Sequence, residues 1–267
     1  MGTTLEIQNL TVGYAAPVVR ELSFSAEAGE LVGILGRNGC GKTTLLRGMT
    51  GGARVFGGAV RVNGEDCLAL RPRTRAKRLA LLPQRTEVLP GLCAGEVIEM
   101  GLYARGGLFG APDEAGRARV RRAAEGFGIA DRLDTDCARL SEGQRQLVQL
   151  ARVAVQDAPV LLLDEPDAAL DFYNTHLLFR TVRGWLARQG KAAAVVLHDP
   201  ALALRWCDRL LLLKDGRAAG CFAARGACAA DAQAALRRLY PEICVKQDKE
   251  TGVFHCVLEP NVENSFF

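Results

Sequence analysis

The chain has 267 residues, of which 49% are hydrophobic and 24% are charged. These values are typical of a globular protein with a sizeable core, and they exclude an intrinsically disordered chain. The formal net charge of +4 argues neither for nor against a nucleic-acid partner.

Targeting and redox signals point to the inside of a cell. The first ten residues lack the apolar run of a signal peptide, and no apolar stretch approaches the ~18 residues of a membrane span. We therefore expect another chain to cross the bilayer if this one serves a membrane process. The nine cysteines are odd in number and include no Cys-x-x-Cys pair. This favours reduced cytosolic thiols, with metal binding as the weaker alternative.

Strand and helix signals alternate in the first part of the chain. Strands are expected at residues 5–10 and 31–35, a glycine-rich loop at 36–41 and a helix at 42–49. A hairpin is expected where residues 57–62 run into Asn63-Gly64. A basic helix at 72–78 and a short strand at 79–82 follow.

From about residue 85 to 158 the strand signals vanish. Ala, Arg and Leu recur at helical spacing at 117–127 and 147–155, with a loop expected at 106–112. Alternation then resumes, with strands at 160–163, 193–197 and 210–213 and helices at about 175–189 and 201–207. This order predicts a mostly parallel sheet covered by helices, into which the helical segment is inserted. Residues beyond about 239 give no clear pattern.

The glycine-rich loop has the pattern of a phosphate-binding loop. Its residues are Gly36, Arg37, Asn38, Gly39, Cys40 and Gly41, followed by Lys42 and Thr43, which fits G-x-x-x-x-G-K-[ST]. Backbone N–H groups of such a loop surround phosphate oxygens, and the following helix N-terminus favours negative charge. Lys42 would reach the β- and γ-phosphates and Thr43 would hold Mg²⁺. A chance match is the alternative, but a match between an apolar strand and a helix is the context the motif requires.

Two acids end the apolar run at 160–163. Open α/β sheets bind ligands at the carboxyl ends of their strands. Asp164 is therefore expected to hold Mg²⁺, and Glu165 to polarise an attacking water as general base. Taken alone, the pair could instead cap a helix.

A helix start lies about twenty residues before this pair. It reads Leu140-Ser141-Glu142-Gly143-Gln144 and precedes an amphipathic segment. Ser141 and Gln144 have the spacing of a capping box. By itself this is an ordinary helix N-terminus.

Together these segments resemble the ATP-binding cassette (ABC) ATPases over roughly residues 3–240. The matching positions are the phosphate loop, Gln84 after an apolar strand, the segment 140–144, Asp164-Glu165, Ala169-Leu170-Asp171 and His198-Asp199. The resemblance implies an α/β fold with a P-loop NTPase core and a mostly parallel sheet, an N-terminal antiparallel β subdomain and an inserted α-helical subdomain. It implies one ABC ATPase domain over 1–267, with its core at 1–84 and 159–240, the helical subdomain at 85–158, and an extension at 241–267 whose role is open.

The resemblance also implies roles for single residues. Tyr14 would stack on adenine, Gln84 would sense Mg²⁺ and the attacking water and couple to a membrane partner, and His198 would contact the γ-phosphate. The alternatives are a tyrosine at a strand edge, a polar loop residue and a structural histidine. The implied catalytic set is Lys42, Gln84, Glu165 and His198, and the Mg²⁺ set is Thr43, Gln84 and Asp164. The implied ATP-binding set is Tyr14, Gly36, Arg37, Asn38, Gly39, Cys40, Gly41, Lys42, Thr43, Thr44, Ser141, Gly143, Gln144 and Asp171.

In ABC ATPases the signature helix of one chain closes over the ATP of another, so the resemblance implies a homodimer around two ATP molecules. Asp171 matches the loop that contacts the partner chain. Departures from the family pattern are modest: Arg37, Cys40, Glu142 and Ala168 stand where Pro, a small residue, Gly and Ser are usual. Cys40 predicts a site that is sensitive to thiol reagents.

Segments 38–47, 97–101 and 169–174 further resemble importer ATPases for iron–siderophore, haem and cobalamin, whereas residues 101–105 depart from them. This implies a peripheral protein at the cytoplasmic face of a bacterial-type membrane, with permease subunits and, indirectly, an extracytoplasmic binding protein as partners. Another transporter type, or an ABC ATPase acting on DNA or ribosomes, is the alternative. The basic run at 71–78 would suit nucleic acid, but a solvated helix face is favoured, and no nucleic-acid partner is expected. A P-loop kinase and an inactive scaffold are disfavoured by the signature, Lys42, Asp164, Glu165 and His198.

Overall fold

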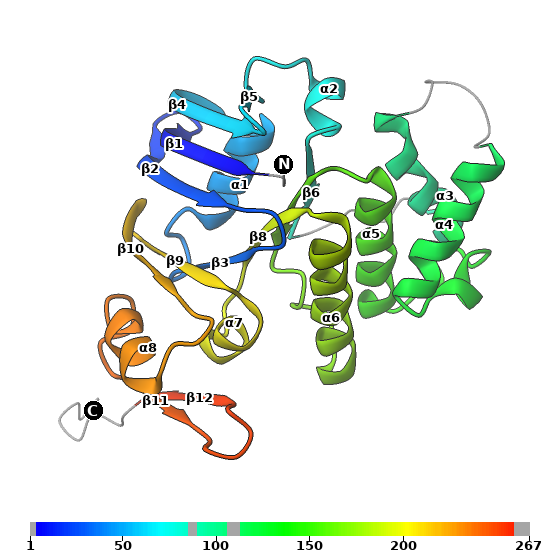
Figure 1. Cartoon of the computed structure of the whole chain (residues 1–267). Coiled ribbons are helices and arrows are strands. Elements are labelled where there is room, and N and C mark those ends of the chain that lie inside the picture. Colours follow the sequence, from blue (N-terminus) through cyan, green and yellow to red (C-terminus); the bar gives the residue numbers. More distant parts are fainter. Residues whose placement is uncertain (1–3, 85–89, 106–112, 259–267) are drawn as a thin grey trace, which may run out of the picture.

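The computed structural model describes residues 4–84, 90–105 and 113–258 (Figure 1). Its main sheet contains β3 (Leu31–Leu35), β6 (Leu79–Leu82), β7 (Val160–Asp164), β8 (Ala192–Val196), β9 (Arg209–Lys214) and β10 (Arg217–Ala223), in the spatial order β10-β9-β3-β8-β7-β6. Every pairing is parallel except that of β10 with β9. All residues of β3, β7 and β8 are buried, and all are apolar except Asp164 at the end of β7. The prediction of a mostly parallel sheet is confirmed.

A second, antiparallel sheet lies beside the first. It contains β1 (Leu5–Gly13), β2 (Pro17–Ala26), β4 (Arg54–Val62) and β5 (Glu65–Asp66), in the order β2-β1-β4-β5. The predicted hairpin joins β4 to β5 through Asn63 at φ 53° and Gly64 at φ 81°. Two positive φ angles make the turn that Asn-Gly favours. The sequence did not predict β2.

The helices are α1 (Lys42–Thr50), α2 (Pro72–Ala76), α3 (Ala94–Glu99), α4 (Glu114–Gly126), α5 (Glu142–Gln156), α6 (Phe172–Gln189), α7 (Pro200–Trp206) and α8 (Ala229–Leu236). Short 3-10 helices are η1 (Met100–Ala104), η2 (Ala130–Arg132) and η3 (Cys137–Arg139). The helical segment expected between the two halves of the sheet is present: α3, α4 and α5 pack on one another between β6 and β7 of the chain. The loop predicted at 106–112 lies outside the described residues.

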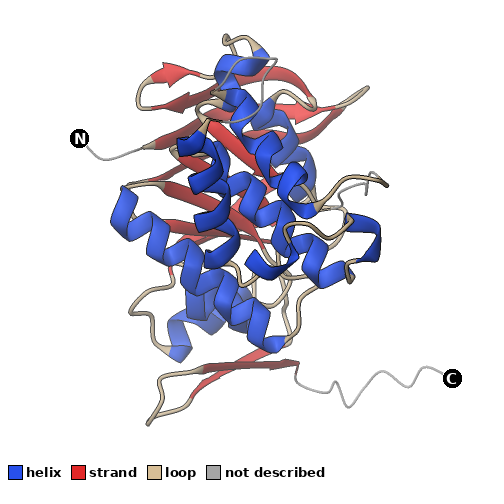
Figure 2. Ribbon diagram, turned by 90° about the vertical axis from the view of Figure 1, so that its right-hand side faces the viewer, coloured by secondary structure: helices blue, strands red, loops and turns tan. Residues whose placement is uncertain are grey.

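Two apolar cores lie on opposite faces of the main sheet. One packs α1 and the antiparallel sheet against one face, with Leu45, Leu46 and Met49 of α1 fully buried. The other packs helices α3 to α7 against the opposite face, as the layer of helices in Figure 2 shows. Among the described residues, no helix is long and apolar enough to cross a membrane.

The C-terminal segment packs on the second core. A hairpin of β11 (Ile243–Gln247) and β12 (Phe254–Leu258) follows α8. Strand β11 contacts α8, and β12 contacts α7. Ile243, Val245 and Phe254 are buried in the core. The segment that the sequence left unassigned therefore completes this face of the molecule. The division of the chain into core, helical subdomain and extension stays a prediction.

Candidate functional site

The phosphate-binding loop joins the end of β3 to the start of α1. A Cβ at Gly36 would lie 2.4 Å from the Leu213 oxygen, so only glycine fits there. Gly41 has φ 106°, a conformation that side chains other than glycine rarely adopt. Lys42 is buried and its Nζ donates to the Gly36 oxygen at 2.8 Å and to the Arg37 oxygen at 3.3 Å. The lysine ammonium therefore lies inside the loop, where phosphate oxygens could replace the carbonyls.

The other loop residues divide by exposure. Arg37, Asn38 and Gly39 are exposed at the tip, whereas Cys40 and Thr44 are buried. Burial raises the pKa of the Cys40 thiol, and the nearby Lys42 ammonium partly offsets this. The exposed tip is therefore the part of the loop that is open to solvent.

Thr43 and Asp164 form the second part of the site. The Thr43 hydroxyl Oγ1 donates to Asp164 Oδ1 at 3.3 Å. Asp164 is only 2% exposed, and this burial raises the pKa of its carboxyl, although the hydrogen bond from Thr43 opposes the rise. A desolvated carboxylate beside a hydroxyl supplies the hard oxygen ligands that Mg²⁺ prefers. These residues fit a Mg²⁺ ion.

Glu165 lies between two polar side chains. Gln84 Nε2 donates to Glu165 Oε2 at 2.7 Å, and His198 Nε2 lies 2.5 Å from Glu165 Oε1. The three residues follow β6, β7 and β8, which are adjacent parallel strands, so their side chains meet at one edge of the sheet. Glu165 has φ 50°, and its backbone N–H donates to the Val196 oxygen at 3.2 Å. A strained backbone that is held by a neighbouring strand is a common feature of functional sites.

Tyr14 lies at the end of a strand of the antiparallel sheet. It follows β1, and its side chain is exposed, with the hydroxyl accepting a hydrogen bond from Arg47 Nη1 at 3.4 Å. Arg47 lies on α1, the helix that begins at Lys42. The tyrosine therefore contacts the helix that carries the phosphate loop, and its stacking on adenine stays a prediction.

The signature segment caps α5. The Ser141 hydroxyl accepts from the Gln144 N–H at 3.2 Å, and Gln144 Oε1 accepts from the Ser141 N–H at 3.0 Å, so the predicted capping box is confirmed. A Cβ at Gly143 would lie 2.9 Å from the Ala169 oxygen. The start of α5 therefore packs directly against the loop before α6.

Asp171 ends that loop and caps α6. Its Oδ1 accepts from the Asn174 N–H at 2.8 Å, and its Oδ2 accepts from Asn174 Nδ2 at 3.1 Å. The hydrogen bonds of residues 4–84, 90–105 and 113–258 include none from Ser141, Gln144 or Asp171 to the phosphate loop of the same chain. The structure thus groups Lys42 with the carboxylates and leaves the signature segment and Asp171 outside that group.

Gln146 was missed by the sequence analysis. It is buried on α5, and its Nε2 donates to the Pro166 oxygen at 3.1 Å. Pro166 directly follows Glu165, so this bond links the signature helix to the turn that carries the glutamate. The available signal was a glutamine on the apolar face of an amphipathic helix, since a buried amide needs a partner.

Comparisons with known proteins fit this geometry. Residues 19–168 match the model of the ABC transporter family. The chain is 38% identical over 215 residues to the "Cobalamin import ATP-binding protein BtuD" of Halobacterium salinarum, which covers 80% of this chain and 54% of that relative. It is 38% identical over 226 residues to the "Hemin import ATP-binding protein HmuV" of Bordetella bronchiseptica, covering 81% of this chain and 85% of the relative. The chain thus spans about half the length of the Halobacterium relative.

A solved structure agrees with the fold. The dimeric structure of a bacterial ABC transporter cassette is 25% identical, has a TM-score of 0.75 and covers 84% of this chain and all of that one. The family model spans more than half of the chain, and the relatives exceed 30% identity over four fifths of it. The prediction from the sequence motifs is confirmed: the chain belongs to the ABC transporter family.

Proposed function

We propose that the chain is the ATP-hydrolysing subunit of an importer for a metal chelate of the iron–siderophore, haem or cobalamin type. The observation that carries the ATPase assignment is the position of Glu165, held between Gln84 and His198 at the sheet edge where Thr43 of the phosphate loop contacts Asp164. The substrate class is supported by the two relatives named for cobalamin and hemin import.

The chemistry follows from the groups present. Lys42 and the loop N–H groups bind the β- and γ-phosphates of ATP, and Tyr14 stacks on adenine. Thr43 and Asp164, with Gln84, hold Mg²⁺, which when bound neutralises charge on the phosphates. Glu165 accepts a proton from water as the water oxygen bonds to the γ-phosphorus and the bond to the β-phosphate oxygen breaks. His198 contacts the γ-phosphate and orients it.

We further propose that two copies of the chain complete two sites. Ser141 is exposed at the N-terminus of α5, and the start of α5 carries partial positive charge. Placed against the ATP of a second copy, Ser141, Gly143 and Gln144 would cover the γ-phosphate, and Asp171 would contact the partner. Support comes from the separation of these residues from Lys42 within one chain and from the dimeric cassette of similar fold.

The proposal includes partners and a location. Permease subunits would cross the membrane, an extracytoplasmic binding protein would deliver the chelate, and this chain would lie peripherally on the cytoplasmic face. Within the chain, residues 1–84 and 159–240 would form the nucleotide-binding core, residues 85–158 the helical subdomain, and residues 241–267 an extension. Contact between Gln84 and the base Glu165 gives the permease a route to the reacting groups.

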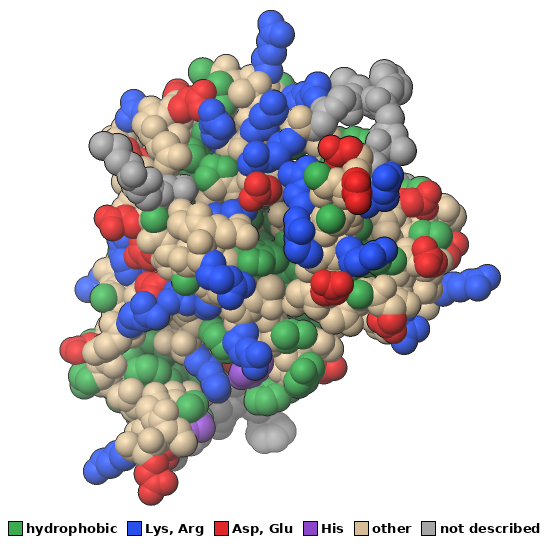
Figure 3. Space-filling model, turned by 45° about the vertical axis from the view of Figure 1, so that its right-hand side comes forward, with side chains coloured by type: hydrophobic (Ala, Val, Ile, Leu, Met, Phe, Trp, Pro, Cys, Tyr) green, Lys and Arg blue, Asp and Glu red, His purple; other side chains and the backbone are tan. Residues whose placement is uncertain are grey.

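Two arginines of the basic run at residues 71–78 make contacts within the chain, which disfavours nucleic acid as a partner. Arg75 donates to the Cys67 oxygen at 2.8 Å and to the Thr50 oxygen at 2.9 Å, and Arg78 pairs with Glu65 at 2.6 Å. These arginines hold local structure. On the face in Figure 3, Lys and Arg side chains gather across the upper half, with Asp and Glu among them.

An uptake assay tests the proposal. A strain that lacks this gene should lose ATP-dependent uptake of one labelled chelate among haem, cobalamin and ferric siderophore. The wild-type gene should restore that uptake and the Lys42→Ala gene should not. Normal uptake of all three chelates in the deletion strain would reject the substrate class. Absence of phosphate release by the purified wild-type protein together with its permease would reject the ATPase itself.

A further inference from the structure

A cavity of about 420 Å³ lies at the C-terminal side of the molecule. It is formed by α6, the end of α7, the connection between β10 and α8, and the β11–β12 hairpin. It shares no lining residue with the nucleotide site. Its volume is within the range of pockets that hold small molecules.

The charge of this cavity is strongly one-sided. Three arginines from three different segments line it: Arg183 of α6, Arg205 of α7 and Arg225 of the β10–α8 connection. The one acid in its lining is Asp208. The lining therefore has a formal excess of two positive charges, which favours an anion.

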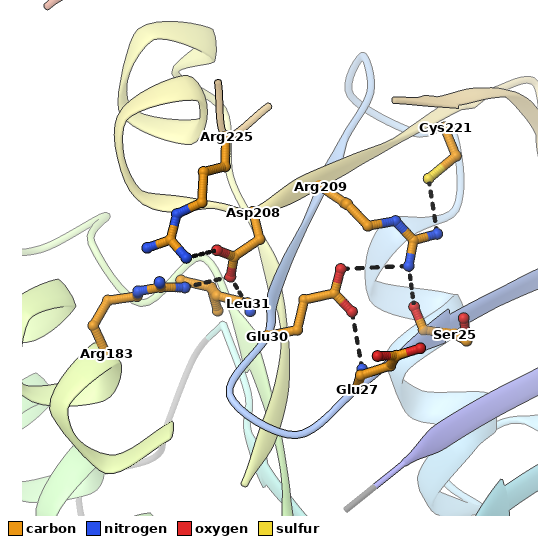
Figure 4. A network of polar contacts seen from close by, with 9 residues as sticks. All are labelled: Ser25, Glu27, Glu30, Leu31, Arg183, Asp208, Arg209, Cys221 and Arg225. Atoms are coloured by element: carbon orange, nitrogen blue, oxygen red, sulfur yellow. Dashed lines mark hydrogen bonds and ion pairs between the residues drawn. The ribbon is translucent and has the colours of Figure 1, made fainter. Parts of the chain in front are cut away.

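Asp208 fixes two of the arginines in place, as Figure 4 shows. Its Oδ2 accepts hydrogen bonds from Arg183 Nη1 and, at 2.8 Å, from the Leu31 N–H, while its Oδ1 lies 3.0 Å from Arg225 Nη1. A guanidinium has five N–H donors. The contacts of Arg183 and Arg225 use only Nη1, and within the described residues their other donors have no hydrogen-bond or ion-pair partner.

Arg205 completes the cluster from the opposite element. Its guanidinium lies 5.8 Å from the centre of the Trp206 ring, and its side chain is exposed. None of the ion pairs found in the described part of the chain involves Arg205. Trp206 and Phe254 give the cavity an apolar wall, and Gln247 and Gly252 of the hairpin line it as well. The C-terminal hairpin therefore forms one side of a built cavity.

One short helix, α7, connects this cavity to the nucleotide site. α7 begins at Pro200, two residues after His198, and ends at Trp206 in the cavity lining. His198 in turn contacts Glu165. A ligand that orders the end of α7 therefore acts on the element that follows the γ-phosphate histidine.

We propose that this cavity is an effector site for a small organic anion that carries two or more carboxylate or phosphate groups, and that its occupation changes the rate of ATP hydrolysis. Guanidinium groups bind carboxylate and phosphate in a bidentate manner, which suits a ligand that spans two fixed arginines. The chemistry is shared by polycarboxylates and phosphate esters, and the test separates them. The effect on the rate of ATP hydrolysis rests on the proposed ATPase function, whereas the binding of the anion does not.

Tryptophan fluorescence tests whether an anion binds in the cavity. The chain has two tryptophans, so Trp185→Phe leaves Trp206 as the one reporter. Full-length protein is saturated with Mg²⁺-ADP to occupy the phosphate loop, then titrated with citrate or with fructose 1,6-bisphosphate at fixed free Mg²⁺ and ionic strength. We expect a saturable change with one of the two probes. Arg205→Gln and Arg225→Gln should each weaken this binding about tenfold or more.

The control is Arg188→Gln, which removes an exposed arginine of α6 outside the cavity lining and should leave binding unchanged. The probe that binds should change the steady-state ATPase rate of wild type and of Arg188→Gln, but not of the other two variants. Basal ATPase activity without probe, and thermal unfolding, should be the same in all. No saturable change, equal binding by all variants, or binding without a change in rate would each overturn the effector site. If the wild-type protein has no ATPase activity even without the probe, the ATPase assignment itself would be wrong.

Discussion

Gln84 and Glu165 are 81 residues apart in the chain, yet Gln84 Nε2 donates to Glu165 Oε2 at 2.7 Å. The contact forms because β6 and β7 are neighbouring parallel strands whose carboxyl ends coincide, with Leu82 paired to Leu163. His198 contacts the other carboxylate oxygen. The proposed general base is thereby held from two sides, by residues that follow the two strands beside β7 in the order β8-β7-β6.

Replacement of Glu165 by glutamine should abolish most turnover and leave ATP binding intact. The amide keeps the size of the side chain but cannot accept a proton from water. We expect the rate of phosphate release to fall ~10²–10⁴-fold, the usual range for a general base. Equilibrium binding of ATP should stay within a few-fold of wild type. Glu125→Gln, at an exposed position of α4, is the matched control. Retained turnover in Glu165→Gln would dismiss Glu165 as the base.

Asp164→Asn should keep or increase the stability of the protein while impairing its ATPase activity. Burial raises the pKa of Asp164, so the folded protein holds this proton more tightly than the unfolded chain does. The stability contributed by this group is therefore largest below the ordinary carboxyl pKa and declines as pH rises through the raised value. At neutral pH and without nucleotide, Asp164→Asn should equal wild type or exceed it by about 1–2 kcal/mol in unfolding free energy. Its turnover should fall, and the Mg²⁺ concentration needed for the remaining turnover should rise, because Thr43 and Gln84 would hold the ion without the carboxylate.

Urea unfolding between pH 5 and pH 8 measures this difference. The advantage of Asp164→Asn should grow with pH, because the wild-type carboxylate becomes charged in its buried position. If Asp164→Asn were clearly less stable than wild type at pH 8, the charge of the buried Asp164 carboxylate would already be stabilised by its surroundings without a metal ion.

Gly143→Ala should disturb the contact between α5 and the loop before α6. The new Cβ would lie 2.9 Å from the backbone oxygen of Ala169, which is closer than real Cβ contacts. We expect a loss of about 1–3 kcal/mol in unfolding free energy, together with reduced turnover. Gly126→Ala is the control, since nothing lies within 4 Å of its Cβ position, and alanine in a helix should slightly stabilise. Equal melting temperatures for the two variants would contradict the packing described here.

Cys40 should react slowly with alkylating reagents, in contrast to the sensitivity to thiol reagents that its position in the phosphate loop predicts from the sequence. Burial raises the pKa of its thiol, which lowers the thiolate fraction at pH 7–8. We expect iodoacetamide to label Cys40 about tenfold or more slowly than the exposed Cys221. Peptide mass spectrometry over time measures both rates. Bound Mg²⁺-ATP should slow Cys40 further and leave Cys221 unchanged, and the opposite order of labelling would place Cys40 in an open, charged environment.

The parts of the site that lie on buried strands could be predicted from the sequence. The strands before Gly36 and Asp164 are apolar at every position, and the residues that follow such strands lie at the ligand-binding edge of a parallel sheet. The pairing of Gln84 with Glu165 could not be predicted, because the pattern of one strand does not reveal its neighbour.

The exposed strands could not be predicted for a different reason. β2 contains Glu21 at φ 50°, where the alternation of buried and exposed residues is interrupted. β10 is rich in alanine and glycine and has no fully buried residue. Its side chains therefore give no strand pattern, and the strand forms because its backbone pairs with β9. The C-terminal hairpin is short, and its contacts with α7 and α8 are long-range. Its part in a charged cavity is visible only in three dimensions.

The central claim is that two chains enclose two ATP molecules, and the mass of Glu165→Gln in solution tests it most directly. Sedimentation equilibrium with Mg²⁺-ATP should give twice the 28.7 kDa of one chain. The mass should return to that of the monomer with Mg²⁺-ADP or when Ser141→Arg is added. A monomer at high concentration with saturating Mg²⁺-ATP, even in the presence of the permease, would contradict the account.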